Sequence, residues 1–181
     1  MTHNNPKLTA KIALYQPDIP QNTASIIRTC SCLGVKLEII EPCGFTFHDK
    51  RFRRVVMDYL DEKMIKIYEN SDQFFEAKKG SRIVLMTTKA KDSIKSFKIK
   101  KNDTFLFGRE SAGVPKNVHH KVDKRIKIPI LKKKIVELVN HCINGVVKIN
   151  IIIKLFNGRK YKKKISTKLV LNYSRINLSR N

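Results

Sequence analysis

The alternation of strand-like and helix-like segments near the start of the chain constrains the fold most. The apolar run Lys11–Tyr15 is followed by the proline-bounded turn Pro17–Pro20. Next, Thr23–Leu33 repeats apolar residues with the period of one helical face, and Lys36–Ile40 is strand-like again. A strand, a helix and a strand in this order form a β-α-β unit. The sequence therefore predicts an α/β protein with a mainly parallel sheet and helices on both faces.

Residues at the ends of the predicted helix agree with these boundaries. Asn22 and Thr23 lie where the helix should begin, and both are favourable N-cap residues. Gly34 directly follows the helix and is a natural C-cap. We therefore expect the chain to leave the first strand, turn, and enter a helix near Thr23.

Further elements follow along the chain as far as residue 130. Two more helices and three more strands are predicted, at Phe52–Tyr59, Ser71–Ala77, Arg82–Thr87, Thr104–Phe107 and Lys124–Ile130. The length of 181 residues suits one domain with a real hydrophobic core. We place this core domain at residues 10–131.

Membrane and metal functions find no support in the sequence. No apolar run of about 18 residues occurs, and the N-terminal stretch lacks the apolar segment of a secretory signal. A cytoplasmic protein is therefore expected, with no membrane partner. The four cysteines form no C-x-x-C pair, so no metal site is expected. We predict that these small side chains are buried and reduced; they are Cys30, Cys32, Cys43 and Cys142.

The charge of the chain is strongly positive and unevenly distributed. Lysine and arginine number 38 against 15 aspartates and glutamates, a net charge of +23. Residues 131–181 hold 13 of the basic residues and one acidic residue, Glu137, so about half of the excess lies in under a third of the chain. Such a balance favours polyanions such as RNA or anionic lipid surfaces. The ordinary alternative is a solvated, lysine-rich surface.

Three blocks of sequence carry candidate functional residues. The first, Ile19–Gly34, contains Asn22 and Arg28; the second, Phe105–Pro115, ends a strand at a glycine-rich loop. Open α/β folds place their sites at such strand ends, and glycines let a ligand approach the backbone. The third block, Ile39–Tyr59, holds a dense basic cluster that suits phosphate groups. Taken singly, each block is equally compatible with a helix cap, a surface cation or an ordinary turn.

Taken together and in order, the blocks IPQNT–IIR–LG, IIEPCGF, DKRFRR–MDY, TTK, GRESAGVP and IPI resemble one family. They are similar to the small tRNA (cytidine/uridine-34) 2′-O-methyltransferases of the SPOUT superfamily over about residues 10–131. The resemblance implies an α/β fold with a trefoil knot, a homodimer and S-adenosylmethionine as methyl donor. It also implies a tRNA anticodon loop as partner, with the ribose 2′-hydroxyl of nucleotide 34 as methyl acceptor.

The resemblance also assigns roles to residues. Arg28 would act at the ribose 2′-hydroxyl, and Asn22 and Glu110 would shape that site. A guanidinium keeps its proton far above neutral pH, so we expect Arg28 to stabilise the developing alkoxide or position a phosphate rather than act as a base. S-adenosylmethionine would contact Met86, Gly108 and Ile128, mainly through backbone groups. The RNA backbone would be bound by the basic block Lys50, Arg51, Arg53 and Arg54.

The resemblance ends near a run of lysines. After IPI the family places a loop of the approximate form RSLNL and an apolar helix that closes the knot, whereas this chain has LKKKIVELVNHCINGVV. Codons for Lys134–Leu138, when translated one nucleotide later, permit Arg-Ser-Leu-Asn-Leu. We therefore hypothesise that the strand-like basic tail, residues 132–181, is out-of-frame from about Lys134. A genuinely divergent RNA-binding extension is the alternative.

Three functional classes remain open from the sequence. The leading interpretation is an S-adenosylmethionine-dependent RNA ribose methyltransferase. A catalytically inactive RNA-binding remnant keeps the basic block but has lost the cofactor site. A basic structural or membrane-surface protein has the least support, because no amphipathic basic helix stands out.

Overall fold

Seven strands form the centre of the structure, a computed structural model that describes residues 10–128 apart from 48, 57–58 and 60–62. The strands are β1 (Lys11–Tyr15), β2 (Leu37–Ile40), β3 (Ile65–Tyr68), β4 (Ile83–Met86), β5 (Asp92–Ser93), β6 (Thr104–Phe107) and β7 (Lys124–Lys127). They lie in the order β3-β2-β1-β6-β4-β7-β5, and every neighbouring pair is parallel. The predicted parallel sheet is confirmed.

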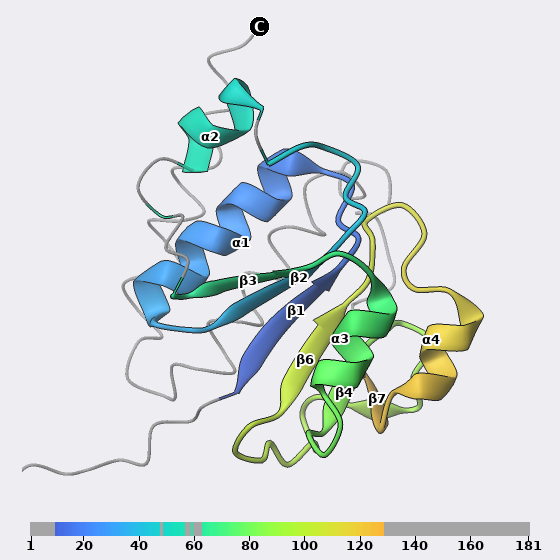
Figure 1. Cartoon of the computed structure of the whole chain (residues 1–181). Coiled ribbons are helices and arrows are strands. Elements are labelled where there is room, and N and C mark those ends of the chain that lie inside the picture. Colours follow the sequence, from blue (N-terminus) through green and yellow to red (C-terminus); the bar gives the residue numbers. More distant parts are fainter. Residues whose placement is uncertain (1–9, 48, 57–58, 60–62, 129–181) are drawn as a thin grey trace, which may run out of the picture.

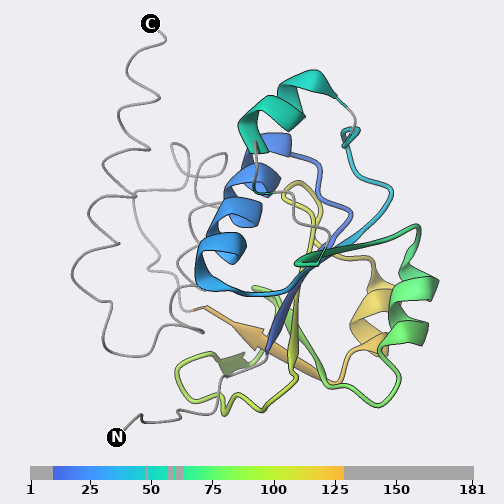
Figure 2. The ribbon, with the colours of Figure 1, turned by 60° about the vertical axis from the view of Figure 1, so that its left-hand side comes forward.

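Helices cover both faces of this sheet, as predicted. Figure 1 shows α1 (Pro20–Leu33) and α2 (Lys50–Val56) on one side, and α3 (Ser71–Ala77) and α4 (Lys116–Lys121) on the other. The rotated view in Figure 2 shows the same three layers, with the sheet between the two pairs of helices. Parallel strands are joined through such crossovers, so both faces of the sheet become buried.

The alternation of side chains along β1 divides the core into two clusters. Ile12 and Leu14 face α1, where they join a cluster that includes Ile26. Ala13 and Tyr15 face the other way and join a cluster that includes Phe74 of α3 and Val118 of α4. Successive side chains of a strand point to opposite faces, which explains why β1 is nearly continuously apolar.

The first helix begins earlier than the sequence predicted. Helix α1 starts at Pro20, its N-cap is Ile19, and no side chain caps it. The prediction of Asn22 and Thr23 as N-caps is therefore wrong: proline fits the first turn of a helix and moves the start upstream. At the other end Gly34 has a φ of 64° and donates its N–H to the carbonyl groups of Cys30 and Ser31, which confirms the predicted C-cap.

Most other predicted elements are found within a few residues of their predicted bounds. The structure reproduces the predicted helix Ser71–Ala77 and the predicted strand Thr104–Phe107. The strand predicted at Lys124–Ile130 is observed as β7, which ends at Lys127. Residues 129–130 lie outside the described part. The sequence did not predict β3, β5 or α4. Strand β5 has two residues, and α4 buries a single apolar residue, Val118, so neither presents a clear period. The predicted tail, residues 132–181, also lies outside the described residues.

Three of the four cysteines can be placed. Cys30 is buried and Cys43 is half-buried, and burial raises the pKa of both thiols to about 12. The prediction that the cysteines are buried is wrong for Cys32, which is exposed on α1, while Cys142 lies outside the described residues. Within the described ranges, no helix is long and apolar enough to cross a membrane. The same ranges contain no group of three potential metal-binding side chains.

Three aromatic rings attach α2 to the rest of the molecule. The centroids of Phe45, Phe47 and Phe52 lie 4.9–5.3 Å apart, and Phe52 is buried against the α1 side of the sheet. Aromatic pairs at this separation stabilise beyond the area they bury. The short helix α2 is thus held by its apolar side, and its basic side is left for solvent.

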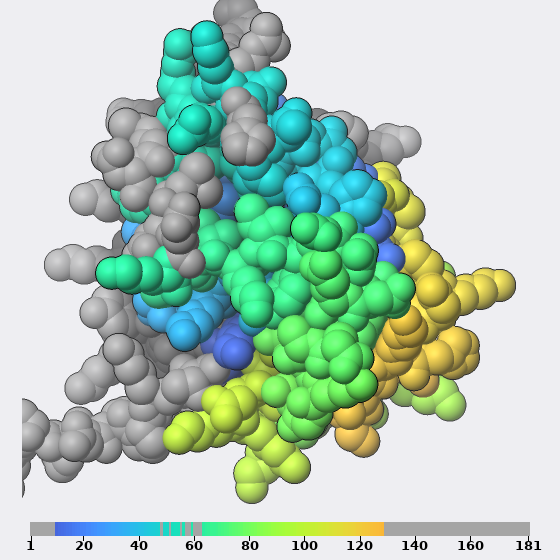
Figure 3. Space-filling model, viewed as in Figure 1, coloured from blue at the N-terminus to red at the C-terminus, as the bar shows by residue number. Residues whose placement is uncertain are grey.

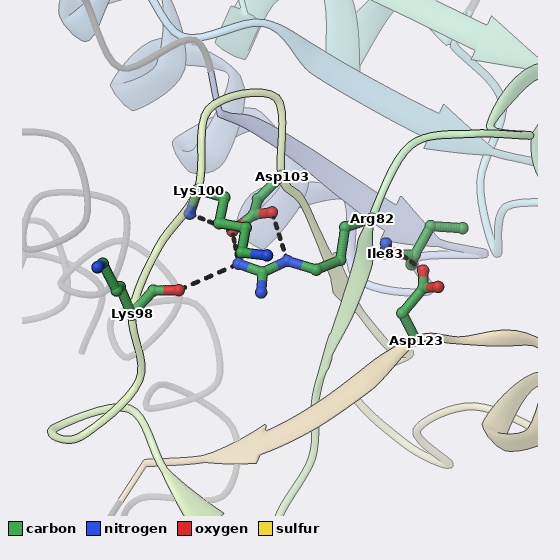
Figure 4. A network of polar contacts seen from close by, with 6 residues as sticks. All are labelled: Arg82, Ile83, Lys98, Lys100, Asp103 and Asp123. Atoms are coloured by element: carbon green, nitrogen blue, oxygen red, sulfur yellow. Dashed lines mark hydrogen bonds and ion pairs between the residues drawn. The ribbon is translucent and has the colours of Figure 1, made fainter.

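An ion pair between half-buried Arg82 and buried Asp103 joins β4 to β6 at the amino-terminal edge of the sheet. The guanidinium of Arg82 donates to both carboxylate oxygens of Asp103, at 2.7 Å and 2.6 Å, and to the carbonyl of Lys98 at 3.1 Å (Figure 4). The Asp103 side chain is only 1% exposed and also accepts from the N–H of Lys100. Asp103 raises the pKa of Arg82 through this hydrogen-bonded pair, although burial opposes the shift. The pair therefore aligns the starts of two central strands.

We predict that Asp103→Asn lowers the free energy of unfolding by about 1–3 kcal/mol, because the half-buried guanidinium of Arg82 would lose the charge-assisted hydrogen bonds that it donates to a buried carboxylate. Asp72→Asn is the matched control, because the Lys121–Asp72 pair is largely exposed and should contribute less than about 0.5 kcal/mol. Chemical denaturation of both variants measures the difference. Equal losses in the two variants would contradict the structural role given to Asp103.

Candidate functional site

The sheet changes its winding direction between β1 and β6, which are neighbours. The chain leaves β1 toward α1 on one face, and leaves β6 toward α4 on the other face (Figure 1). The two loops therefore diverge at the carboxyl-terminal edge of the sheet. In open α/β sheets, ligands bind in the crevice at such a switch point. A ligand site is therefore expected at this edge of the sheet.

The carboxylate of Asp18 joins the two loops at this point. Its Oδ1 accepts from the N–H of Glu110 at 3.2 Å, and its Oδ2 accepts from the N–H of Ser111 at 3.3 Å and from the Ser111 hydroxyl. In return, the N–H of Asp18 donates to Oε2 of Glu110 at 3.2 Å. Residues 92 and 93 positions apart in sequence are thereby fixed side by side, and Glu110 is held at the switch point.

These hydrogen bonds also determine the charge of Asp18. Partial burial opposes ionisation of this carboxyl, but the hydrogen bonds from Glu110 and Ser111 outweigh it and lower the pKa from 3.8 to about 2. Asp18 is consequently ionised at neutral pH, and its negative charge stabilises the arrangement of the two loops.

The loop that follows β2 packs against the same place. Gly44 donates its N–H to the carbonyl of Pro17 at 2.9 Å, and a Cβ atom on Gly44 would lie 2.8 Å from the Cα of Asp18. The Gln16 side-chain amide donates to the backbone carbonyl of Glu41 at 3.3 Å, and the backbone carbonyl of Gln16 accepts from Nε of Arg109 at 3.1 Å. The loops after β1, β2 and β6 thus form one packed unit.

Two glycines allow the loop after β6 to turn back on itself. Arg109 and Gly113 exchange backbone hydrogen bonds of 2.9 Å and 3.1 Å, and Gly113 has a φ of +70°. A Cβ atom on Gly108 would lie 2.5 Å from the carbonyl carbon of Gly113. Gly108 thus permits the close approach of Gly113, while the space beside Gly113 is open; the contact of these glycines with a ligand stays a prediction.

The three residues predicted to contact the cofactor lie at the carboxyl ends of three neighbouring strands. Met86 ends β4, where it pairs with Phe107 of β6 and with Ile126 of β7. Gly108 is the residue after Phe107, and Ile128 lies two residues beyond Ile126. Met86 and Ile128 are half-buried and pack against the same apolar cluster. The geometry brings these residues to one edge; their contact with a cofactor stays a prediction.

The three residues predicted to be catalytic have different surroundings. Glu110 is half-buried and bonded to Asp18, and Asn22 lies one turn into α1, only 3% exposed. The side-chain Nδ2 of Asn22 is buried and has no hydrogen-bond partner. Arg28 is exposed further along α1, roughly 9 Å from Asn22 by helix rise, with its guanidinium 5.7 Å from the centroid of the Tyr59 ring. Asn22 and Glu110 thus flank the switch point, and Arg28 extends from the same helix.

The basic block predicted to bind RNA lies on α2. Lys50, Arg53 and Arg54 are exposed, and the helix packs beside α1 (Figure 2). Arg51 belongs to the same helix, but its side chain is outside the described part. The block therefore lies on the same side of the sheet as α1 and Arg28.

Asp18 is the functional residue that sequence reasoning missed. It stands inside the turn Pro17–Pro20, where an aspartate is an ordinary turn residue. Its partners, Glu110 and Ser111, are more than 90 residues away, so no local pattern could indicate the contact. The available signal was its position in the turn that follows the first strand of a predicted parallel sheet.

The fold and the site define an open, parallel α/β protein with its candidate site at a carboxyl-terminal switch point. The chain belongs to the SpoU rRNA methylase family, whose model matches residues 9–136. It is 46% identical over 121 residues to a tRNA (cytidine(34)-2′-O)-methyltransferase of Beijerinckia indica, a match that covers 66% of this chain and 76% of the relative.

Solved structures agree with this membership. A structure described as "Structural insights into the 2-OH methylation of C/U34 on tRNA" superposes with a TM-score of 0.68 and 28% identity, covering 79% of this chain and 90% of that chain. An AdoMet-bound rRNA methyltransferase from Sinorhizobium meliloti has a TM-score of 0.66 at 17% identity, covering 80% of this chain and 54% of that one. The second likeness supports the fold alone.

We predict that Asp18→Asn lowers the free energy of unfolding by about 1–2 kcal/mol at pH 7. This is less than the free energy that corresponds to the whole pKa shift, because Asp18 is partly exposed and solvent screens its charge. The folded-state pKa is lowered, so the stabilisation is present above the unfolded value near 3.9 and is lost as pH falls toward 2. The difference between the unsubstituted chain and the variant should therefore shrink between pH 4 and pH 2.

Urea denaturation at several pH values measures that difference. Asp92→Asn, at an exposed strand end, controls for the removal of one negative charge from a basic protein. A difference for Asp18→Asn that stays constant from pH 7 to pH 2 would contradict the assignment of the shift to the ionised carboxylate.

Proposed function

We propose that the chain is a methyltransferase that moves a methyl group from S-adenosylmethionine to the ribose 2′-hydroxyl of nucleotide 34 in tRNA. The observation that carries this proposal is the convergence at the switch point, where Asp18 fixes Glu110 beside the ends of β4, β6 and β7. Family membership and the tRNA (cytidine(34)-2′-O)-methyltransferase of Beijerinckia indica support the choice of substrate.

The residues at this edge fit S-adenosylmethionine. The half-buried side chains of Met86 and Ile128, at the ends of β4 and β7, supply apolar surface next to Gly108, which suits the flat face of an adenine. The buried Nδ2 of Asn22 lacks a hydrogen-bond partner, and a buried donor left unpaired costs about 1–3 kcal/mol. Such a cost is tolerated at sites where function requires the group. When bound, the cofactor supplies an electrophilic sulfonium methyl group.

The chain's own residues then orient and activate the ribose. Arg28 keeps its proton at neutral pH, so its guanidinium stabilises negative charge that develops on the 2′-oxygen. Packing against the Tyr59 ring restricts the position of that guanidinium. Glu110 is held by the N–H of Asp18, and we assign it, with Asn22, to positioning the ribose. Correct placement of the reacting atoms supplies much of the rate enhancement in such transfers.

The RNA approaches from the side of α1 and α2. Lys50, Arg53 and Arg54 are exposed on α2 and would bind phosphates of the anticodon loop, together with Arg51 of the same helix. A nucleotide in a single-stranded loop can be turned out of its stack, which exposes its ribose to the site. Bases of the loop need not be paired for this contact.

Further properties of the family are included in the proposal. They are a homodimer, a trefoil knot formed by the segment after β7, and action in the cytoplasm, where tRNA is modified. Residues 129–181 lie outside the described part, so the knot and the dimer rest on family membership. The division into a core of residues 10–131 and a basic tail of residues 132–181 is supported by the family model, whose match ends at residue 136.

An inactive RNA-binding remnant is the second candidate. It is favoured by the loss of the RSLNL-like loop after Leu131 and by the charge of residues 131–181, which hold 13 basic residues and one acidic residue. Loss of that loop would leave the basic helix α2 intact while removing part of the cofactor pocket. Calorimetric titration with S-adenosylmethionine distinguishes the two candidates, because the remnant binds none.

We predict that the chain, incubated with S-adenosylmethionine and tRNA transcripts, produces a 2′-O-methylated nucleotide 34, detected by mass spectrometry of RNA digests. Asn22→Ala should reduce this product at least about 100-fold, as removal of a preorganised donor does. Its free energy of unfolding should change by less than about 1 kcal/mol, because the donor Nδ2 of the removed amide has no hydrogen-bond partner.

Thr29→Ala is the control for a purely structural change in the same helix. The Thr29 hydroxyl is largely buried and donates to the carbonyl of Ser25 at 2.8 Å, so its loss should lower stability and leave methylation intact. If Asn22→Ala instead destabilised the chain and kept its activity, the functional role of Asn22 would be wrong.

We further propose that residues from about Lys134 onward are translated out of frame. DNA sequencing of the coding region should then find an adenine run at Lys132–Lys134 and, one nucleotide later, an open frame that encodes an RSLNL-like loop followed by an apolar helix. A chain encoded in that frame should bind S-adenosylmethionine more tightly than this one. A region without such a frame would establish the tail as a divergent extension.

A further inference from the structure

A cavity of about 320 Å³ opens at the amino-terminal edge of β1, β2 and β3, on the side of the sheet that α3 covers. Its lining includes five lysines and one carboxylate: Lys11, Lys36, Lys63, Lys66, Lys78 and Glu38. In Figure 3 the start of β1, in dark blue, is visible in this region beside the green surface of α3. We call it the lysine cavity.

The inner part of the lysine cavity contains a buried ion pair between Lys78 and Glu38. The ammonium of Lys78, at the end of α3, lies 2.5 Å from Oε1 of Glu38, and both side chains are almost fully buried. Burial lowers the pKa of Lys78, while the hydrogen bond to Glu38 opposes that shift. Oε1 of Glu38 is thus engaged mainly by Lys78, and Lys11 lies further away at 3.9 Å, while Oε2 of Glu38 is buried without a hydrogen-bond partner.

The outer part of the cavity carries positive charge on adjacent strands. Leu37 is the register partner of Ile12, so Lys36 and Lys11 stand opposite one another, directly before these residues. Lys66 is the register partner of Glu38, which places it roughly 8 Å from Lys36 by strand spacing and rise. Like charges in such positions destabilise a sheet. Among the described residues, no carboxylate forms an ion pair with Lys36 or Lys66.

The position of Lys66 is restrained rather than free. Its ammonium lies 4.8 Å from the centroid of the Tyr68 ring, and Tyr68 is buried. A cation held over an aromatic face keeps its charge available at low entropic cost. Lys36 is exposed at the rim of the same cavity. The arrangement presents two exposed ammonium groups around a recess, which suits the oxygens of a phosphate.

We propose that the lysine cavity binds phosphates of the RNA backbone, as a second contact for the substrate at the edge of the sheet opposite to the candidate active site. The inference rests on the proposed function, because it takes the RNA to be the substrate tRNA. Strand β1 has five residues, so the two edges are roughly 15 Å apart, and β3 is the edge strand past which an RNA bound on the α1 side would reach the α3 side.

An anionic membrane surface is a less suitable partner. A surface that binds lipid headgroups usually adds apolar side chains that enter the bilayer. The single large hydrophobic residue exposed in the described ranges is Ile67, whose side chain points to the opposite face of β3 from Lys66. Among the described residues, the lysines at the rim of the cavity therefore have no exposed apolar side chain beside them that could enter a bilayer.

The test compares double variants of the full chain in their binding to a tRNA transcript over a range of salt concentrations. Lys36→Gln with Lys66→Gln should weaken binding about 10-fold near 0.1 M salt and reduce the slope of log affinity against log salt by about two, one for each lysine. Lys36→Arg with Lys66→Arg should preserve both values, because the charge remains. Lys91→Gln with Lys95→Gln, at exposed lysines outside the cavity, is the matched control and should preserve the slope.

Two further measurements separate the possible failures. Calorimetry with S-adenosylmethionine tests the proposed function alone. If the unsubstituted chain binds no cofactor, the proposed methyltransferase activity is wrong, and this result does not test RNA binding by the lysine cavity. An unchanged salt slope in the Lys36→Gln, Lys66→Gln variant overturns the RNA contact. If that variant keeps the slope for tRNA but loses binding to phosphatidylserine vesicles, the cavity serves a membrane surface and the inference is wrong.

Discussion

The carboxylate of Asp18 is the interaction on which the candidate site depends. Parallel strands bring their carboxyl ends to one edge, but the loops that follow β1 and β6 depart toward opposite faces of the sheet. Asp18 accepts hydrogen bonds from the N–H groups of Glu110 and Ser111, and its own N–H donates to Glu110. The start of α1 and the glycine-rich loop are thereby held as one unit. This unit positions the candidate catalytic residues Asn22 and Glu110.

The two edges of the sheet carry different kinds of polar interaction. At the amino-terminal edge, Arg82 and Asp103 form an ion pair that aligns β4 with β6, and Lys78 and Glu38 form a buried pair under α3. Each charge at these positions has a direct partner, as stable buried charges require. Three buried side-chain atoms of the described residues nevertheless lack a hydrogen-bond partner: Oε2 of Glu38, Oγ1 of Thr104 and, at the carboxyl-terminal edge, Nδ2 of Asn22. Of these three atoms, Nδ2 of Asn22 is the one that lies at the switch point, beside the proposed site.

Much of the fold could be predicted from the sequence, because strand and helix periods are local properties. Lys11–Tyr15, Ser71–Ala77 and Thr104–Phe107 were predicted within their observed bounds. The start of α1 was missed because Pro20 begins the helix, whereas Asn22 and Thr23 offered more conventional caps. Helix α4 could not be found from its period, since Val118 is its one buried residue. The contact of Asp18 with Glu110 joins residues 92 positions apart and depends on the order of strands, which periodicity does not specify.

Hydrogen exchange measured by mass spectrometry, with and without S-adenosylmethionine, tests the central claim most directly. Segments that bind a ligand through backbone groups exchange more slowly in the complex. The account predicts that protection is confined to the ends of β4, β6 and β7, around Met86, Gly108 and Ile128, and to the loop at Asp18. The account would be contradicted by protection elsewhere with these strand ends unchanged.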